Sequence, residues 1–371
     1  MYCCYFFCIN FKYMSETEIN DIRGYSEFKG ISFSKFKKTD VKKELLNSLI
    51  NSKIEPACYW SAELICAGHY SDLWETILFF YTKHVHLGNP KIAIYLELRI
   101  KHFKEIIENG YLDNEIRLRN NNKIRKLFCE VMCILCDAKR KHSFDTVKIK
   151  KEDFDMTQMR DKFKAISNKY AQDIFLDEDP KELFPAINEI GYNISEEGKN
   201  VMDACYWLEW IMEFENVCKS KKEKIFCERR NFSQVETKFQ KDIIWVVWDL
   251  LIFEAGNRSK LMKKILNALL NLFCLKYTSG CQKKRRNILY FAITLLCENH
   301  INNEDIIREL QQEKISNVIK KIDQIYKQIK KNEVSPGTDY LFKDIKSSNL
   351  EKTIEKLETM NTFGETFIPR I

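Results

Sequence analysis

Two groups of cations have the composition of a polyanion-binding surface. The first stands at the expected start of a helix: Lys283, Lys284, Arg285 and Arg286. The second fills a linker between expected helices: Lys219, Lys221, Lys222 and Lys224. Cations at a helix N-terminus oppose the helix dipole unless an anion binds there, so the first group in particular predicts contact with nucleic acid or phosphate. A solvated loop accounts for the same residues.

Cysteines and histidines offer a second kind of chemistry, metal binding. Cys129, Cys133 and Cys136 share one stripe of an expected helix, and His142 follows six residues later. Structural zinc sites normally take two cysteines from one tight turn, whereas a helical stripe of thiols among Leu, Phe and Met is typical of a core. Four further residues form a histidine group without a cysteine or carboxylate at matching spacing: His69, His84, His86 and His102. We therefore expect no bound metal.

Signatures of common enzymes are missing. The sequence contains no phosphate-binding loop of the P-loop type, no dinucleotide-binding glycine motif, no nucleophile elbow and no kinase signature. Eleven glycines in 371 residues leave little backbone that could wrap a phosphate. Glu63 lies among aromatic residues, where burial would raise its pKa as in a catalytic acid, but capping or ion pairing is the preferred interpretation. We expect no cofactor and favour a non-catalytic protein.

Helices must position all these residues. With 45% hydrophobic residues, 11 Gly and 6 Pro, the chain has a core to bury and few turn residues, which predicts an all-α fold. Apolar residues recur at helical spacing over twelve stretches. These expected helices cover residues 41–50, 57–67, 73–85, 92–107, 123–139, 156–171, 201–217, 236–254, 260–277, 283–299, 304–331 and 349–360.

The helices group into two predicted bundles. Residues 14–145 form the first and residues 199–333 the second, joined by an irregular region, 146–198, with one short helix. Residues 334–371 add a C-terminal helix and a tail. Residues 1–13 form an apolar leader, which lies upstream of the true start if translation begins at Met14.

The two predicted bundles share short sequence matches. Ala57-Cys-Tyr-Trp60 corresponds to Ala204-Cys-Tyr-Trp207, and residues 123–137 match residues 284–298 at several positions. An internal duplication explains these pairs. Chance similarity between helices rich in Leu, Ile and Lys explains them equally well.

Charge and cysteine content limit the setting of the protein. A formal net charge of +7 permits a polyanion partner without requiring one. The 14 cysteines are irregularly spaced in a long, lysine-rich chain, which predicts thiols in a reducing, intracellular compartment. No run of about 18 uncharged apolar residues occurs, so we expect no membrane span.

Residues 54–90 carry a resemblance to a known family. The matching elements are Ala57-x-Tyr-Trp60, Ala62-Glu63, Ala67-Gly68 and Lys83-x-x-x-Leu87-Gly88-x-Pro90. This segment resembles the helical oligomerisation region that follows the ATPase core in AAA+ replication-recombination proteins, and the collar domains of clamp loaders. The chain departs from that family by having no ATPase core. Together with Phe33-Ser34 and Lys37, the segment is also similar to uncharacterised proteins of nucleocytoplasmic large DNA viruses.

The resemblance implies a collar-like, non-catalytic protein of viral DNA replication or repair, located in the host cytoplasm or at a viral replication site. It would bind a protein partner or a second copy of itself through residues of this region: Tyr59, Trp60, Glu63, Trp74, Lys83, His84, His86, Asn89 and Pro90. The alternative is a direct nucleic-acid-binding protein that uses the cations named above. An enzyme with a buried carboxylate such as Glu63, beside His84 and His86, is the least favoured hypothesis.

Overall fold

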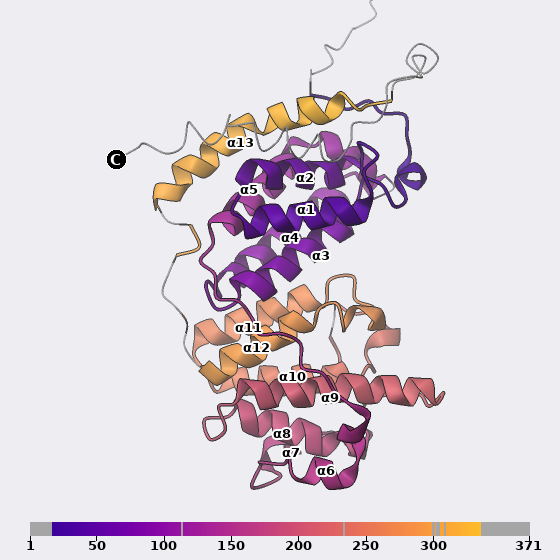
Figure 1. Cartoon of the computed structure of the whole chain (residues 1–371), viewed down its shortest axis with the longest axis vertical. Coiled ribbons are helices and arrows are strands. Elements are labelled where there is room, and N and C mark those ends of the chain that lie inside the picture. The colour runs from indigo at the N-terminus through magenta and orange to yellow at the C-terminus, as the bar shows by residue number, and fades with distance from the viewer. Residues whose placement is uncertain are drawn as a thin grey trace, which may run out of the picture. The chain divides into compact units, whose positions relative to one another are not determined.

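The computed structural model describes residues 17–334, apart from residues 113, 233, 299–300, 302–304 and 308 (Figure 1). The structure is 64% helical, and its described residues form thirteen α-helices and no strand. The predicted all-α fold is thus confirmed. The predicted leader, the start at Met14 and the helix over residues 349–360 lie outside the described residues. No helix within the described ranges is long and apolar enough to cross a membrane.

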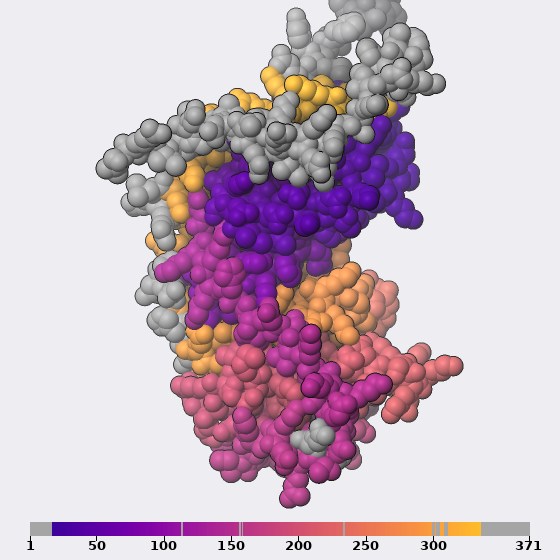
Figure 2. All heavy atoms as spheres, viewed as in Figure 1, coloured from indigo at the N-terminus to yellow at the C-terminus, as the bar shows by residue number. Residues whose placement is uncertain are grey.

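The chain divides into two compact units, each assembled from separate stretches of sequence. Of the described residues, unit 1 takes those in Met1–Thr76, Phe103–Cys136 and Ile307–Ile371, and unit 2 takes those in Ile77–His102 and Asp137–Ile306. The boundaries predicted at residues 145, 198 and 333 differ from this division. The region 146–198, expected to join two bundles, belongs to unit 2. Figure 2 shows one face of the described residues with all heavy atoms drawn as spheres.

Unit 1 is built around aromatic side chains. Its complete helices are α1 (Lys38–Ile50), α2 (Ile54–Cys66) and α13 (Glu309–Lys330), with all but the last residue of α5 (Asn122–Asp137) and parts of α3 (Tyr70–Phe80) and α4 (Ile92–Glu108). The rings of Tyr70, Trp74 and Phe103 gather around Phe128 of α5, with centroids 5.0–6.3 Å from that of Phe128. The amphipathic α13 packs on α2.

Unit 2 contains the remaining helices. They are α6 (Met156–Arg160), α7 (Lys169–Gln172), α8 (Phe184–Ile194), α9 (Val201–Ser220), α10 (Ile244–Gly256), α11 (Lys260–Phe273) and α12 (Arg286–Glu298). Asn200 and Ser259 cap α9 and α11, since their side chains accept hydrogen bonds from the N–H groups of Asp203 and Met262. The helix α10 is apolar around most of its circumference and packs against α8, α9, α11 and α12.

Three stretches of the chain differ from the prediction. The stretch 156–171 contains only α6 and the first part of the one-turn α7, and the stretch 236–254 begins with a 3-10 turn, Thr237–Phe239, before α10. The stretch from Pro185 to Gly198, expected to be irregular, contains all of α8 except its first residue, Phe184. Pro185 suits the first turn of a helix, and Gly191 lies so close to the backbone of Tyr170 that a Cβ would come within 2.8 Å of it.

One detail of packing recurs in the two units. Tyr59 and Trp60 of α2 meet edge-to-face with ring centroids 5.1 Å apart, and Tyr206 and Trp207 of α9 do so at 5.2 Å. Both tryptophans are buried. Neighbouring residues on a helix adopt such a pair without common ancestry, so the internal duplication stays a prediction.

Candidate functional site: an acid-rimmed apolar cleft in unit 2

The aromatic residues predicted to bind a partner lie inside unit 1. Tyr59, Trp60 and Trp74 are 2–3% exposed and Glu63 is 0% exposed. Trp60 also packs edge-to-face with Phe36. Direct contact between a partner and these four predicted side chains would therefore require unit 1 to open, and in the closed unit they contribute to its core.

Glu63 holds a loop onto α2. Its carboxylate accepts hydrogen bonds from the backbone N–H and the hydroxyl of Ser34, and Asn332 donates to the same hydroxyl at 2.8 Å. Burial raises the pKa of Glu63, as the sequence suggested. The residue belongs to unit 1, whereas His84 and His86 belong to unit 2, so the three do not assemble within one unit as the buried-carboxylate enzyme would need.

The other predicted partner-binding residues gather in unit 2, at a feature that we call the histidine seam, residues 81–90 and 139–145. The first segment of the seam contains a π-helical turn, Tyr81–Val85, which lies beside the second segment, residues 139–145. The N–H of Lys141 donates to the carbonyl of Val85, and the N–H of Ser143 donates to that of Lys83. The seam is thus a backbone-paired contact between segments that are far apart in sequence.

Predicted residues fill this seam with structural contacts. Lys83 donates to the carbonyl of Phe144 at 2.7 Å, and Asn89 donates to that of Asp305 at 3.2 Å. The carbonyl of Pro90 accepts a hydrogen bond from the Tyr81 hydroxyl at 3.0 Å. Asn89 and Pro90 are buried, so of the five predicted residues in the seam only Lys83 and His84 reach the surface.

The three histidines of the seam, His84, His86 and His142, have unusual surroundings. His84 and His142 place their Nδ1 atoms 3.1 Å apart, and burial, with a smaller contribution from His142, lowers the pKa of His84 to about 4. His86 is 2% exposed, and its ring packs against that of Phe291 at an interplanar angle of 36°, with the ring centroids 4.6 Å apart. Neither of its ring nitrogens finds a hydrogen-bond partner among the described residues, and burial lowers its pKa to about 3.

Carboxylates of α9 neutralise the cations at the start of α12. Arg286 binds Glu209 at 3.2 Å and Lys283 binds Glu213 at 3.4 Å. Arg285 is buried and donates to the carbonyl of Phe273. The anion that the helix start requires is therefore supplied from within unit 2, which removes the argument that favoured nucleic acid at this point.

The remaining predicted cations are mostly exposed. Lys219 pairs with Glu215 at 2.8 Å. Lys221, Lys222 and Lys224 follow the end of α9 and are exposed, as is Lys284. The predicted nucleic-acid surface is thus reduced to four exposed lysines.

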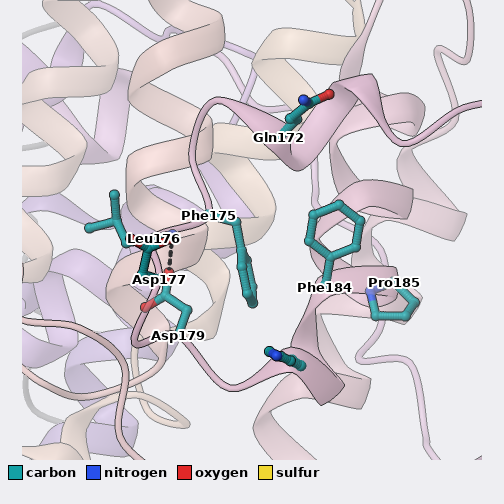
Figure 3. A pocket seen from close by; sticks show the side chains of 8 residues that line it. Gln172, Phe175, Leu176, Asp177, Asp179, Phe184 and Pro185 are labelled. Atoms are coloured by element: carbon teal, nitrogen blue, oxygen red, sulfur yellow. Dashed lines mark hydrogen bonds between the residues drawn. The ribbon is translucent and has the colours of Figure 1, made fainter.

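A cleft between α7 and α8 is the feature that the sequence analysis missed (Figure 3). It has a volume of about 460 Å³. Its lining combines apolar and charged side chains: Gln172, Phe175, Leu176, Asp177, Asp179, Lys181, Phe184 and Pro185. The rings of Phe175 and Phe184 meet edge-to-face with centroids 5.2 Å apart, and Leu176 beside them is 39% exposed. The cleft therefore presents an open apolar surface.

A buried ion pair fixes one wall of this cleft. The carboxylate of Asp179 is bound by the Arg230 guanidinium at 2.6 Å and accepts the N–H of Leu176 at 2.9 Å, a bond drawn in Figure 3. Arg230 also binds Asp249 at 2.7 Å. The loop that carries Leu176 and Asp177 is consequently anchored to the core of unit 2 before any ligand arrives.

The rim of the cleft carries an excess of negative charge. Asp179 is neutralised by Arg230, but Asp177 is exposed, as are three acidic residues adjoining the lining in sequence: Asp173, Glu178 and Glu182. Lys181 is the one exposed cation among the lining residues. The run Asp177-Glu-Asp-Pro180 lies in the region 146–198, which was predicted only to join two bundles, and the signal for a site was the aromatic residues on either side of the run, Phe175 and Phe184.

Comparisons with protein-family models, with curated proteins and with solved structures find nothing that matches this chain.

Proposed function

We propose that this chain is a non-catalytic helical protein that binds a partner protein through the cleft between α7 and α8. The partner segment is an extended peptide that inserts one apolar side chain and carries basic residues on both sides of it. The observation that supports this proposal is the combination, in one preformed cleft, of an acidic rim with an apolar surface made by the exposed Leu176 and the half-buried Phe175, Phe184 and Pro185.

Each part of the cleft has a separate energetic role. Covering Phe175, Leu176 and Phe184 removes apolar surface from water, at about 25 cal/mol per Å². The exposed carboxylates favour a basic segment and disfavour an acidic one, which sets specificity and association rate more than total affinity. Because the ion pair of Asp179 and Arg230 already anchors the loop that carries Leu176 and Asp177, ordering this loop costs little free energy on binding.

Two synthetic peptides test the proposal. One places Phe-Leu between Lys-Arg pairs and the other places the same Phe-Leu between Glu-Asp pairs, each with a fluorescent label for anisotropy. We expect the basic peptide to bind the full-length protein at least about tenfold more tightly at low salt, with a difference that shrinks as salt screens the charges. Equal binding of the two peptides, or none, would contradict the proposal.

Surface variants locate the binding site. Asp177→Lys reverses one rim charge and Leu176→Ala removes exposed apolar surface, and both side chains are exposed, so the fold is retained. Each variant should weaken the basic peptide several-fold. Met202→Ala, an exposed apolar residue of unit 2 outside the lining, is the matched control and should leave binding unchanged.

The narrower role, a collar-like protein of viral DNA replication or repair, depends on the resemblance of residues 54–90 and stays a prediction. Direct nucleic-acid binding also stays a prediction. It requires that Lys221, Lys222, Lys224 and Lys284 produce an affinity that falls steeply with salt concentration.

A further inference from the structure

Three thiols from two helices converge in the interior of unit 1. Cys58 lies on α2, and Cys129 and Cys133 lie one turn apart on α5. Their sulfur atoms are all within 4.8 Å of one another, and those of Cys58 and Cys129 are 3.9 Å apart. The latter distance is nearly twice a disulfide bond of about 2.05 Å, so the residues are thiols. Among the described residues this is the one such group of three metal-ligating side chains.

The spacing matches a three-coordinate metal centre. Metal–sulfur bonds of about 2.3 Å in a trigonal plane separate the sulfurs by about 4.0 Å, close to the Cys58–Cys129 distance. The other two distances need to shorten by less than 1 Å, which side-chain rotation of Cys133 can supply. Zn²⁺ in structural sites takes four ligands, whereas three soft sulfur ligands suit Cu(I).

The surroundings of the thiols also suit a soft ion. Cys58, Cys129 and Cys133 are 1–2% exposed, so water is kept from the centre. Arg125 lies one turn before Cys129 on the same face of α5 and is itself 4% exposed, with its guanidinium 3.9 Å above the ring of Tyr326. Arg125 therefore brings a positive charge into the core of unit 1 near Cys129 along α5, where it also pairs with Asp323 at 3.7 Å.

We propose that Cys58, Cys129 and Cys133 form a buried Cu(I) site. On binding, each S–H group releases its proton to the buffer as a Cu–S bond forms, and copper remains Cu(I) throughout. Three thiolates and one Cu(I) carry a net charge of −2. The ion would link α2 to α5, so its role is to hold unit 1 together.

Unit 2 supplies the natural comparison. The sequence match that pairs residues 123–137 with residues 284–298 places Tyr290 and Thr294 opposite Cys129 and Cys133, and it pairs Cys58 with Cys205. Cys205 is as deeply buried as Cys58 but belongs to no group of three ligands among the described residues. It is therefore the matched control for Cys58.

The test uses Cu(I) itself with the full-length protein. Copper is supplied in two ways, anaerobically as its bicinchoninate complex and during synthesis in copper-supplemented medium, and bound copper is counted per chain. We expect one Cu(I) per wild-type chain and X-ray absorption showing three sulfurs at about 2.3 Å. Cys58→Ser should lower the affinity more than about tenfold, while Cys205→Ser leaves it unchanged.

Several results would overturn the proposal. They are the absence of copper under both loading conditions, equal binding by wild type and Cys58→Ser, fewer than three sulfur ligands, and binding of Zn²⁺ without Cu(I). If Cys58→Ser fails to fold, Cys58→Ala replaces it, and the X-ray absorption of the wild-type protein decides on its own. If the three thiols serve only as core packing, no copper will be bound under either loading condition.

Discussion

At the scale of single residues, buried polar groups of this chain are held by partners nearby in space. Glu63 accepts hydrogen bonds from Ser34, and Asp179 accepts them from the guanidinium of Arg230. Glu209 accepts hydrogen bonds from both Arg286 and Tyr290. Removing one member of such a group leaves the other buried without compensation, which costs more free energy than the contact itself supplies. His86, neither of whose ring nitrogens has a hydrogen-bond partner among the described residues, is one of several exceptions, as are the hydroxyl of Tyr70 and the indole N–H of Trp74.

Gly88 is the residue at which the histidine seam tolerates no side chain. A Cβ at this position would lie 2.2 Å from the carbonyl oxygen of Lys139. Because that atom belongs to the backbone, the seam would have to move apart, and we expect Gly88→Ala to lower the free energy of unfolding by about 2 kcal/mol. Gly256→Ala is the matched control, since nothing lies within 4 Å of its Cβ position at the end of α10. Chemical denaturation should find that control unchanged or slightly stabilised.

His86 predicts how stability depends on pH. Its pKa is lowered by burial to about 3, whereas in the unfolded chain it is about 6.5. As the pH falls below 6.5 the unfolded chain therefore binds the proton first, and stability is lost until the pH reaches about 3. At pH 5 this loss amounts to about 2 kcal/mol.

The variant His86→Asn isolates this contribution. Asn does not titrate, and it adopts a positive φ, here 47°, more often than most residues. Urea denaturation at pH 7 and pH 5 should show that the wild type loses about 2 kcal/mol more than the variant between the two conditions. The variant itself will be less stable at pH 7, because it lacks the ring that packs against Phe291. Equal losses in the two proteins would show that His86 is protonated in the folded state.

At the scale of elements, the contact between α9 and α12 depends on charges that the sequence analysis assigned to nucleic acid. The Glu209 side chain is 8% exposed, and that of its partner Arg286 is 21% exposed. Arg286→Ala should therefore lower the free energy of unfolding by about 2 to 3 kcal/mol, because it leaves the buried carboxylate of Glu209 without its cationic partner. Lys284→Ala, the exposed neighbour, should change it by less than about 0.5 kcal/mol. Thermal unfolding of the two variants checks this, and equal effects would contradict it.

The match between predicted and observed helices shows which elements a sequence can predict. The helices α9 and α11 were predicted from periodic apolar residues, and their polar caps confirm where they begin. The helix α8 was missed because Pro185 and Gly191 are read locally as breakers, although one starts the helix and the other permits close packing. Periodicity also placed Cys129 and Cys133 on one face of α5. It carried no information on Cys58, which reaches them only through the tertiary fold.

Long-range contacts limit the prediction of the candidate site in the same way. The cleft depends on Arg230, which fixes Asp179 from 51 positions away in the sequence. A local reading of Asp177-Glu-Asp-Pro180 sees only charge and a proline, which are typical of a linker. What could be recognised from sequence was the pair of Phe residues flanking the acidic run, without any indication that their rings meet.

At the scale of the whole molecule, the composition of each unit from discontinuous stretches has a consequence for cooperativity. Unit 2 includes residues 77–102, where Tyr81 and His86 pack on Phe291 of α12 and Glu97 binds Asn271 of α11. These residues should open together with α8 to α12, although the predicted domain boundaries assign them to the first bundle. Regions that unfold cooperatively exchange their amide hydrogens together.

Hydrogen exchange on two destabilised full-length variants distinguishes the two divisions. Arg286→Ala weakens unit 2 and should speed exchange in residues 77–102 as well as 184–298, while residues 38–66 keep their protection. Phe128→Ala opens a cavity in the aromatic core of unit 1 and should do the reverse, speeding exchange in 38–66, 122–136 and 309–330. If Arg286→Ala instead affects only residues 199–333, the boundaries predicted from the sequence describe the cooperative units better, because residues 77–102 would then be stable without α12.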